Sequence, residues 1–261
     1  MRIARGLDGL HASPHPAFVV VGVFDGLHLG HQYLLEHLVE EAAARSARPV
    51  VLTFDHHPDE LITGSAPPLL CDPDERLARM EEAGVETVVV VHFDQAMRQT
   101  TYDDFVARLA ARAPLAGFLM TPDAAFGYRR GGTPETLAAL GREQGFEVVV
   151  VPPFSLDGRP VSSTDVRAAI AAGDLVEAAA LLGRLHMVVG EAVPEGEGSA
   201  LRFPLPVAVP PDGGWEARVD TPEVAGFEVV ELREGRVWLA GPGRTGRTRV
   251  AFMGPAPNRR G

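Results

Sequence analysis

The sequence contains no lysine, since all 24 of its basic residues are arginines. This absence excludes a lysine Schiff base and the phosphate-binding lysine of a Walker A loop. A single cysteine, Cys71, excludes an intramolecular disulfide and a CxxC metal site. Basic residues are outnumbered by 35 Asp and Glu, which gives a net charge of -11. We therefore expect small-molecule substrates and no nucleic-acid or membrane partner.

Long hydrophobic runs are also missing. The longest apolar stretches, such as residues 88 to 91, are far shorter than the roughly 20 residues that span a bilayer. Together with the single cysteine, this favours a cytoplasmic protein. The hydrophobic content of 46% is nevertheless ordinary for a folded chain. At roughly 150 residues per domain, the chain has room for one large domain or a large and a small one.

Short β-branched runs alternate with helical patterns through the first two thirds of the chain. Five runs are predicted as strands: residues 18 to 23, 50 to 54, 87 to 92, 117 to 120 and 147 to 151. Ala, Leu and Met at helical spacing predict helices at about 31 to 46, 74 to 83, 102 to 112 and 134 to 144. This alternation predicts a doubly wound, parallel, five-stranded Rossmann-like α/β sheet, whose ligands bind beyond the carboxyl ends of the strands.

The composition changes near residue 186. Before that point, Gly173 and Asp174 separate two predicted helices, the second of which ends at Leu182. After it, Pro and Gly are dense, and short runs at 207 to 209, 227 to 232 and 237 to 239 predict strands. Residues 241 to 261, rich in Gly, Pro and Arg, are interpreted as a loose end. We predict two domains, residues 1 to 185 and a small β-rich domain at 186 to 261.

The most informative motif is GVFDGLHLGH, residues 22 to 31, which joins the first predicted strand to the first predicted helix. Its glycines allow close backbone approach, and the N–H groups at the helix start can bind an anion. His28 and His31 can then donate hydrogen bonds to charge that develops on a phosphate during transfer. Two other interpretations stay open: the histidines cap or pack the helix, or they form a His-x-x-His metal site.

A second motif, SSTDVR at residues 162 to 167, lies at another junction between a strand and a helix. Hydroxyl side chains at a helix start are typical N-caps, so Ser163 and Thr164 have a purely structural interpretation. Arg167, one turn into the helix, favours a functional one. Its guanidinium, the hydroxyls and the backbone amides could together hold a phosphate.

Together, GxFDGxHxGH and SSTxxR resemble the bacterial FAD synthetase family, the FMN adenylyltransferase half of the bifunctional riboflavin kinase/FAD synthetase. Residues 53 to 58, TFDHHP, resemble the family's TFDPHP, and residues 182 to 184 resemble the LGR that joins its two domains. The resemblance covers approximately residues 18 to 190. It implies transfer of AMP from ATP to the phosphate of FMN, which gives FAD and pyrophosphate, with Mg²⁺ as the usual helper.

The resemblance also implies roles for individual residues. The implied catalytic residues are His28, His31 and Arg167. The implied ATP-binding residues are Gly22, Phe24, Asp25, Gly26, Gly30, Ser163 and Thr164. The implied acceptor-binding residues are His57, Pro58, Asp123, Phe126 and Arg130. No residue is assigned as a metal ligand, and His57, which precedes a proline, also has a structural interpretation as a turn residue.

The flavin side of the motif set departs from the family pattern. The family's GxDFxFGxxRxG is here TPDAAFGYRRGG, so Thr121 and Ala124 replace a glycine and a phenylalanine. His56 replaces a proline nearby. An aromatic wall that could stack on a flavin ring is thereby reduced. Two alternatives stay open: a nucleotidylyltransferase that uses another phosphorylated acceptor or CTP, and a non-catalytic flavin or nucleotide sensor.

The C-terminal region departs further. Leu205 and Val207 stand where the family's kinase domain has a threonine and an asparagine that serve the metal and nucleotide. Neither side chain has an oxygen to offer a cation. We predict that this region is a shortened relic of the riboflavin kinase barrel and does not phosphorylate riboflavin.

Overall fold

The computed structural model describes residues 1 to 241 and 243 to 257, and the chain divides into two compact units. The first unit comprises Met1–Phe24, Gly30–Pro67 and Pro73–Ser155. The second comprises Asp25–Leu29, Pro68–Asp72 and the described part of Leu156–Gly261. Each unit thus draws on three separate stretches of the chain. The domain boundary predicted between residues 185 and 186 stays a prediction.

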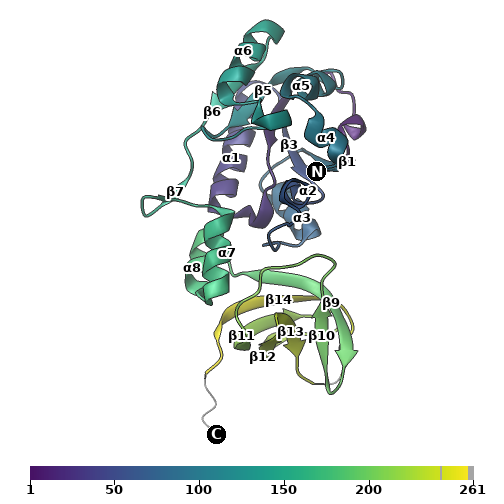
Figure 1. Ribbon diagram of the computed structural model, residues 1–261, viewed down its shortest axis with the longest axis vertical. Coiled ribbons are helices and arrows are strands. Elements are labelled where there is room, and N and C mark those ends of the chain that lie inside the picture. Colours follow the sequence, from purple (N-terminus) through teal and green to yellow (C-terminus); the bar gives the residue numbers. More distant parts are fainter. Residues whose placement is uncertain (242, 258–261) are drawn as a thin grey trace. The chain divides into compact units, whose positions relative to one another are not determined.

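The first unit is built on a parallel six-stranded sheet in the order β1-β4-β3-β2-β5-β6 (Figure 1). The strands are β1 Arg2–Arg5, β2 Ala17–Val21, β3 Arg48–Phe54, β4 Thr87–Val91, β5 Leu115–Met120 and β6 Glu147–Val150. The doubly wound parallel sheet is confirmed, but the predicted count of five strands is wrong. The missed strand, β1, lies at the sheet edge and buries only Ala4 of its four residues, so it lacks the apolar run that marked the other strands.

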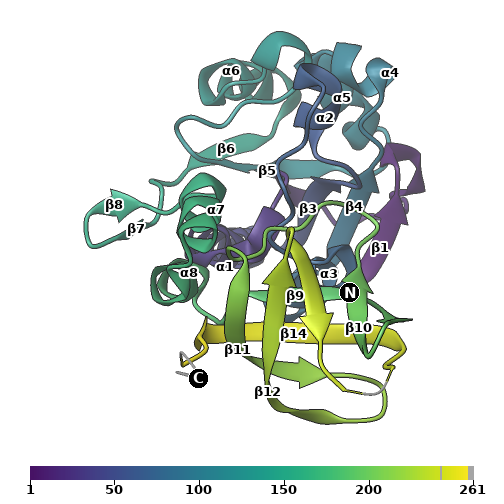
Figure 2. The ribbon, with the colours of Figure 1, turned by 60° about the horizontal axis from the view of Figure 1, so that its bottom comes forward.

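Helices cover both faces of this sheet. Figure 2 shows α5 and α6 on one side and α1 and α3 on the other. The four predicted helices are α1 Leu29–Ala44, α3 Pro73–Glu82, α5 Tyr102–Ala110 and α6 Pro134–Gln144. Short elements that periodicity cannot detect are α2 Pro58–Thr63, α4 Gln95–Gln99, η1 Leu7–Gly9, η2 Asp25–Leu27 and η3 Tyr128–Arg130. Strand residues such as Leu52, Val89 and Phe118 pack with Phe105 and Leu137 from the helices in one core.

The second unit contains two helices and a closed antiparallel barrel with the strand order β10-β13-β12-β11-β14-β9 (Figure 1). The barrel strands are β9 Met187–Glu195, β10 Gly198–Arg202, β11 Gly213–Asp220, β12 Ala225–Arg233, β13 Arg236–Leu239 and β14 Gly246–Pro255. The runs predicted at 227 to 232 and 237 to 239 lie in β12 and β13 and are confirmed. A separate two-stranded sheet pairs β7 Ser155–Leu156 with β8 Arg159–Pro160.

Two expectations about this region are wrong. The run at 207 to 209 is not a strand, and Val207 forms only an isolated bridge with Leu69. Much of the end interpreted as loose is the ten-residue strand β14, in which Val250 and Phe252 are fully buried. Alternation of buried and exposed residues along β14 explains how a Gly- and Arg-rich segment still closes the barrel. The rest of that expectation, at residues 242 and 258 to 261, lies outside the described residues.

Helices α7 Ser163–Ala172 and α8 Leu175–Leu182 follow their predicted stop and start signals. Gly173 ends α7 with φ at 75°, a left-handed conformation in which a side chain is strained. The Asp174 side chain caps α8 by accepting a hydrogen bond from the Glu177 amide at 2.9 Å.

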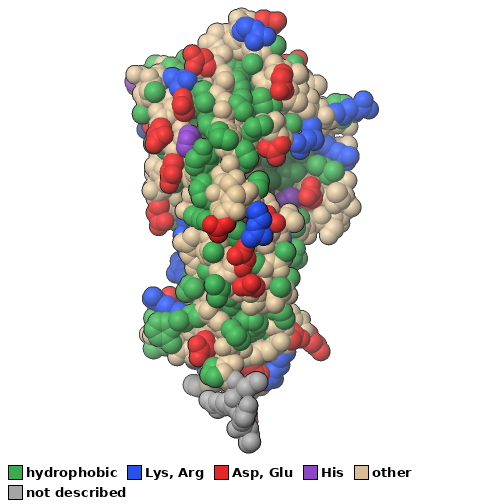
Figure 3. Space-filling model, turned by 90° about the vertical axis from the view of Figure 1, so that its left-hand side faces the viewer, with side chains coloured by type: hydrophobic (Ala, Val, Ile, Leu, Met, Phe, Trp, Pro, Cys, Tyr) green, Lys and Arg blue, Asp and Glu red, His purple; other side chains and the backbone are tan. Residues whose placement is uncertain are grey.

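Within the described residues, no helix combines the length and the hydropathy that crossing a membrane requires. On the face shown in Figure 3, basic side chains occur in small groups among acidic and apolar ones.

The barrel unit buries a histidine whose titration should make stability depend on pH. His186 is 1% exposed and stacks on Phe252, and its Nε2 lies 2.8 Å from the Ala208 carbonyl oxygen. Burial, together with repulsion from Arg184, lowers the pKa of His186 to about 4, although the Ala208 hydrogen bond opposes this shift. Because the folded-state pKa lies below the unfolded value, the neutral ring stabilises the fold above about pH 6.5, and this contribution is lost as pH falls toward 4.

We expect the His186 contribution to the free energy of unfolding to fall by about 2 kcal/mol between pH 7 and pH 5. Urea unfolding at both pH values measures this loss. His186→Gln keeps an N–H donor for Ala208 but does not titrate, so the loss between the two pH values should be smaller by that amount. Equal losses in the two proteins would contradict the prediction. His11→Gln, at an exposed position, is the matched control.

Candidate functional site

The segment at residues 22 to 31 connects β2 to α1 at the carboxyl edge of the sheet, as the sequence predicts. Its backbone is unusual: φ is 55° at Phe24, 80° at Gly26 and 41° at Leu27. Non-glycine residues adopt positive φ infrequently, and buried residues that do so gather at functional sites. The contacts on either side of this segment therefore decide its shape.

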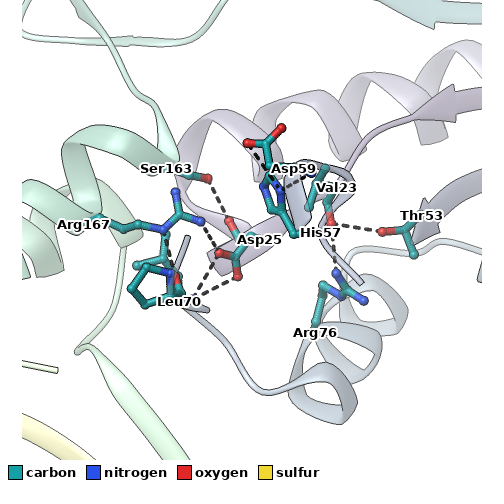
Figure 4. Close-up of polar contacts among 10 residues, drawn as sticks. Val23, Asp25, Thr53, His57, Asp59, Leu70, Arg76, Ser163 and Arg167 are labelled. Atoms are coloured by element: carbon teal, nitrogen blue, oxygen red, sulfur yellow. Dashed lines mark hydrogen bonds and ion pairs between the residues drawn. The ribbon is translucent and has the colours of Figure 1, made fainter. Parts of the chain in front are cut away.

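In the first unit, the contacts fix the start of this segment. The Val23 carbonyl oxygen accepts hydrogen bonds from Thr53 Oγ1 and from Arg76 Nη1, both at 3.0 Å (Figure 4). Thr53 is fully buried, and Arg76 Nη2 also donates to the Phe54 carbonyl at 2.8 Å. The first unit thereby ties the end of β2 to the end of β3. The Phe24 ring, 1% exposed, lies 5.2 Å from the His31 ring.

In the second unit, Asp25 is the centre of a polar network. Its side chain is buried, and Oδ2 forms an ion pair of 2.5 Å with Arg167 Nη2. The Leu70 amide donates to Oδ1 and Oδ2 at 3.0 and 3.1 Å, and Ser163 Oγ donates to the Asp25 carbonyl at 3.1 Å (Figure 4). Arg167 Nε donates to the Pro68 carbonyl at 2.8 Å. The buried carboxylate therefore joins the segment to α7 and to residues 68 to 70.

A second arginine holds the next part of the segment. Arg184 Nη1 donates to the carbonyls of Leu27 and Leu182 at 3.2 and 3.1 Å, and Nη2 donates to the Gly26 carbonyl. One guanidinium thus bonds two consecutive carbonyls of η2 and the last residue of α8. These bonds explain how the positive φ at Leu27 persists.

Gly26 occupies a position that no other residue fits well. A Cβ at this residue would lie 2.9 Å from Leu70 Cβ, in addition to the strain at φ of 80°. We expect Gly26→Ala to lower the free energy of unfolding by about 2 to 3 kcal/mol. Gly235→Ala is the control, because Gly235 has a φ of 69° but a Cβ there would meet no heavy atom within 4 Å. Urea unfolding should give about 1 kcal/mol for that variant, and equal losses at the two glycines would contradict the predicted contact.

His28 is 5% exposed and lies directly before α1. Burial lowers the pKa of His28 to about 4, with repulsion from Arg184 and Arg167 adding to the shift and Asp165 opposing it. The imidazole is therefore neutral at pH 7 and can donate one N–H. The positive charge of Arg184 favours an anion at this place, whereas the Asp25 carboxylate offsets the charge of Arg167. His31 lies in the first turn of α1, and the N-terminal end of a helix favours an anion.

The start of α7 shows whether Ser163 and Thr164 cap the helix or are placed to bind a phosphate. The N-cap is Ser162, whose Oγ accepts a hydrogen bond from the Asp165 amide at 3.3 Å. Ser163 and Thr164 are the first two residues inside the helix, so they do not fill the capping position. Thr164 is exposed. Their amides and the Thr164 side chain therefore lie at the helix N-terminus, where an anion is stabilised, whereas Ser163 Oγ donates to the Asp25 carbonyl.

The residues predicted on the acceptor side have structural contacts of their own. His57 is the N-cap of α2, and its Nδ1 accepts a hydrogen bond from the Asp59 amide at 3.2 Å (Figure 4). Pro58 is the first residue of that helix, a favoured place for proline. These contacts support the structural interpretation of His57.

The segment at residues 121 to 132 contributes both core and surface. The Phe126 ring is half-buried and lies 5.1 Å from the Phe105 ring and 5.9 Å from the Phe118 ring. Asp123 is exposed, and its carbonyl accepts a hydrogen bond from Arg130 Nη2 at 3.0 Å. Phe126 therefore packs toward the core of the first unit, while Asp123 and Arg130 stay at the surface.

Sequence reasoning missed several residues that shape the 22 to 31 segment. Arg76 had no signal, because it is one charged residue among several in α3. The Leu70 amide and the Pro68 carbonyl are backbone groups that no motif encodes. Arg184 did carry a signal, since it belongs to the LGR tripeptide, but its bonds to Gly26 and Leu27 could not be inferred from the tripeptide.

Comparison with known proteins places this geometry in a family. A family model described as FAD synthetase matches residues 10–165. The bifunctional riboflavin kinase/FMN adenylyltransferase of Escherichia coli (strain K12) is 35% identical over 208 residues, which are 78% of this chain and 66% of that protein. The same enzyme of Haemophilus influenzae is 32% identical over 207 residues, which are 78% of this chain and 67% of that protein. The chain therefore spans just under two thirds of the Escherichia coli relative.

A solved structure of a macrolide-efflux protein from Streptococcus pneumoniae is similar in fold, with a TM-score of 0.83 and 22% identity. The match covers 100% of this chain and 92% of that one, and at this identity it bears on the fold alone. The family model and the sequence relatives carry the assignment. From the match over residues 10–165 and from these relatives, the chain belongs to the FAD synthetase family.

Proposed function

We propose that the protein transfers AMP from ATP to the phosphate of FMN, forming FAD and releasing pyrophosphate. The observation that carries this proposal is the arrangement around His28. Its buried, neutral imidazole stands before α1 in a segment with strained backbone, and Arg167 and Arg184 lie near enough to lower its pKa. A neutral N–H donor close to two guanidinium groups is suited to a polyphosphate.

The reaction needs little covalent chemistry from the protein. The acceptor phosphate is ionised at neutral pH, so it can attack the α-phosphorus of ATP in line while pyrophosphate leaves. Positioning and charge stabilisation then supply the rate. His28 and His31 would donate hydrogen bonds to the charge that grows on the transferring phosphoryl group. Backbone amides at the start of α7, at Ser163 and Thr164, would hold the triphosphate.

The structure favours an indirect role for Arg167. Its Nη2 is paired with Asp25, and its Nε donates to Pro68, so part of its guanidinium holds the segment instead of a ligand. We assign Arg167 a positioning role, because the Asp25 carboxylate offsets its charge. As the family resemblance implies, Asp25 would shape the loop under the nucleotide, because its carboxylate accepts hydrogen bonds from Arg167 in α7 and from the Leu70 amide.

The Asp25 carboxylate does not fit a Mg²⁺ ligand. Its two oxygens accept hydrogen bonds from Leu70 and Arg167, and a guanidinium beside a carboxylate disfavours a cation there. We therefore assign no protein ligand to Mg²⁺ and derive no step through it. The family resemblance still implies the ion as the companion of ATP.

The runner-up is transfer of a nucleotide to another phosphorylated acceptor. The half-buried Phe126, which packs on Phe105 and Phe118, favours it, because that ring is directed to the core and Ala124 stands where the family has phenylalanine. Fewer aromatic faces then remain for stacking on an isoalloxazine ring. CTP in place of ATP belongs to the same alternative, and a non-catalytic flavin or nucleotide sensor is a further one.

For the C-terminal barrel we propose that riboflavin is not phosphorylated. The side chains of Leu205 and Val207 have no oxygen for a cation, and the backbone around Val207 is paired with residue Leu69. The Leu69 amide donates to the Pro206 carbonyl at 2.8 Å, and the Ala208 amide donates to the Leu69 carbonyl at 2.9 Å. This pairing places the segment beside Leu70, whose amide bonds Asp25, and gives it a supporting role.

The decisive experiment is chromatographic. The purified chain is incubated with Mg²⁺ and ATP plus FMN, and in parallel with riboflavin, and FAD, FMN and pyrophosphate are measured. FAD from FMN with nothing from riboflavin is the expected result. Absence of FAD would reject FMN as acceptor, and pyrophosphate release with CTP or other phosphorylated acceptors would then support the runner-up. Bound flavin without turnover would support the sensor, and FMN formed from riboflavin would overturn the statement about the barrel.

A further inference from the structure

A group of two histidines and one aspartate lies outside the network described above, at the carboxyl ends of β3 and β4. Parallel pairing sets Phe54 opposite Val91, and the Asp55 amide continues the ladder by donating to the Val91 carbonyl at 3.2 Å. The next residues, Asp55 and His92, therefore come to lie opposite each other. His56 follows Asp55 directly. The sheet itself thus assembles the three side chains within the first unit.

The donor atoms of this group converge. Asp55 Oδ2 lies 2.8 Å from His92 Nδ1, and Asp55 Oδ1 lies 3.2 Å from His56 Nδ1. The two imidazole rings are 5.9 Å apart and nearly perpendicular. One ligand atom from each residue lies within 4.8 Å of the other two. Among the described residues, no other group of three His, Cys, Asp or Glu side chains meets this criterion.

We propose that Asp55, His56 and His92 form a binding site for a divalent transition-metal ion such as Zn²⁺. Imidazole nitrogens and a carboxylate oxygen are typical ligands of this ion, with bonds of about 2.0 to 2.2 Å. Tetrahedral ligands at that bond length lie roughly 3.3 Å apart, so small rotations of exposed side chains suffice to close the site. The proposal does not rest on the proposed adenylyl transfer.

The surroundings suit a cation. The Asp55 carboxylate brings a negative charge to the two imidazoles that it contacts. Asp94, the N-cap of α4, follows His92 by two residues and adds a second negative charge. The His92 and His56 side chains are 67% and 45% exposed. An ion can therefore enter from solvent, and water can complete its coordination.

One ligand of this site departs from the family motif. His56 occupies the position at which the family's TFDPHP motif has proline, and proline offers no metal ligand. With only Asp55 and His92, two ligands would remain, which is fewer than the three protein ligands that open zinc sites use. The replacement of proline by His56 thus supplies the ligand that turns a surface ion pair into a candidate metal site.

The test is a Zn²⁺ titration of the 261-residue chain, freed of metal by a chelator, in competition with a chromogenic zinc indicator. We expect one equivalent of Zn²⁺ to bind. His56→Ala and His92→Ala should each weaken binding by at least about tenfold, whereas His11→Ala, at an exposed position elsewhere, should not. Excess Mg²⁺ should not displace the ion, because Mg²⁺ prefers oxygen ligands. Co²⁺ should give d–d absorption that both site variants lose.

Circular dichroism of each variant checks that the fold is retained, as we expect for exposed side chains. Absence of Zn²⁺ binding would overturn the proposal and leave Asp55 and His92 as a surface ion pair. Binding that persists in both His56→Ala and His92→Ala would also overturn it, by placing the ion elsewhere. Loss of binding in His31→Ala with retention in His92→Ala would assign the metal to the His-x-x-His pair instead.

Discussion

Replacing His28 or His31 with alanine is expected to lower kcat for FAD formation by about 10²- to 10³-fold, equivalent to about 2.7 to 4 kcal/mol of transition-state stabilisation. The reason is the loss of a preorganised hydrogen-bond donor at the start of α1. Steady-state kinetics with ATP and FMN measures the effect. If both variants keep wild-type kcat, the proposed role is wrong. His37→Gln is the matched control, because His37 lies on the same helix and its Nδ1 contacts the Tyr33 carbonyl at 2.9 Å.

The protonation state of His28 predicts how kcat/KM depends on pH and which substitution retains activity. Because the pKa of His28 is lowered to about 4, the ring in the free enzyme should stay neutral down to about pH 5. The pH profile of kcat/KM, which reports groups of the free enzyme, should therefore show no loss near pH 6.5 on account of His28. His28→Gln retains an uncharged N–H donor and should recover part of the activity that His28→Ala loses. A Gln variant as inactive as the Ala variant would argue against simple donation.

Breaking the ion pair between Asp25 and Arg167 is expected to cost about 3 kcal/mol of the free energy of unfolding. Asp25 is 2% exposed, so removing either partner leaves a charge with little solvent to replace the lost contact. Arg167→Gln and Asp25→Asn, measured by urea unfolding, should each show this loss. Arg167→Lys should also lose activity, because an ammonium group cannot bond Asp25 and Pro68 with the same planar geometry.

The double variant measures how much the ion pair itself contributes to the free energy of unfolding. Asp25→Asn combined with Arg167→Gln should cost less than the sum of the two single changes, with a coupling of about 1 to 3 kcal/mol. Additive losses would mean that the ion pair contributes nothing of its own. The exposed pair between Arg233 and Glu231 is the control, since its side chains are 65% and 51% exposed. Arg233→Gln should change stability by no more than about 0.5 kcal/mol.

A loss of kcat in Arg167→Lys at wild-type stability would identify a direct contact with the phosphates. Loss of both kcat and stability would fit the positioning role, because the segment that carries His28 depends on the Asp25 bonds. Measurement of KM for ATP adds a further distinction. A raised KM with unchanged kcat would place Arg167 in ground-state binding of the nucleotide.

The sequence by itself determined the layer architecture of the first unit. Buried parallel strands are nearly continuous apolar runs, and helices between them repeat apolar residues at helical spacing, so both patterns are local. The 22 to 31 motif could be placed at a β-to-α junction for the same reason. Strand β1 was not predicted, because it buries only one side chain and has no apolar run. Strand β14 was not predicted, because its Gly and Arg residues masked the alternation of buried and exposed positions.

Only the tertiary structure decided how the candidate site is held. Arg167 lies 142 residues from Asp25 along the chain, and Arg184 lies 158 residues from Gly26, yet both bond the same short segment. Sequence shows that an arginine is present but not which carbonyl or carboxylate it reaches, because that depends on how distant segments fold together. His92 lies opposite Asp55 for a similar reason, the register of two parallel strands. Residue types thus indicated the chemistry, whereas long-range packing determined which groups meet and which histidines are neutral.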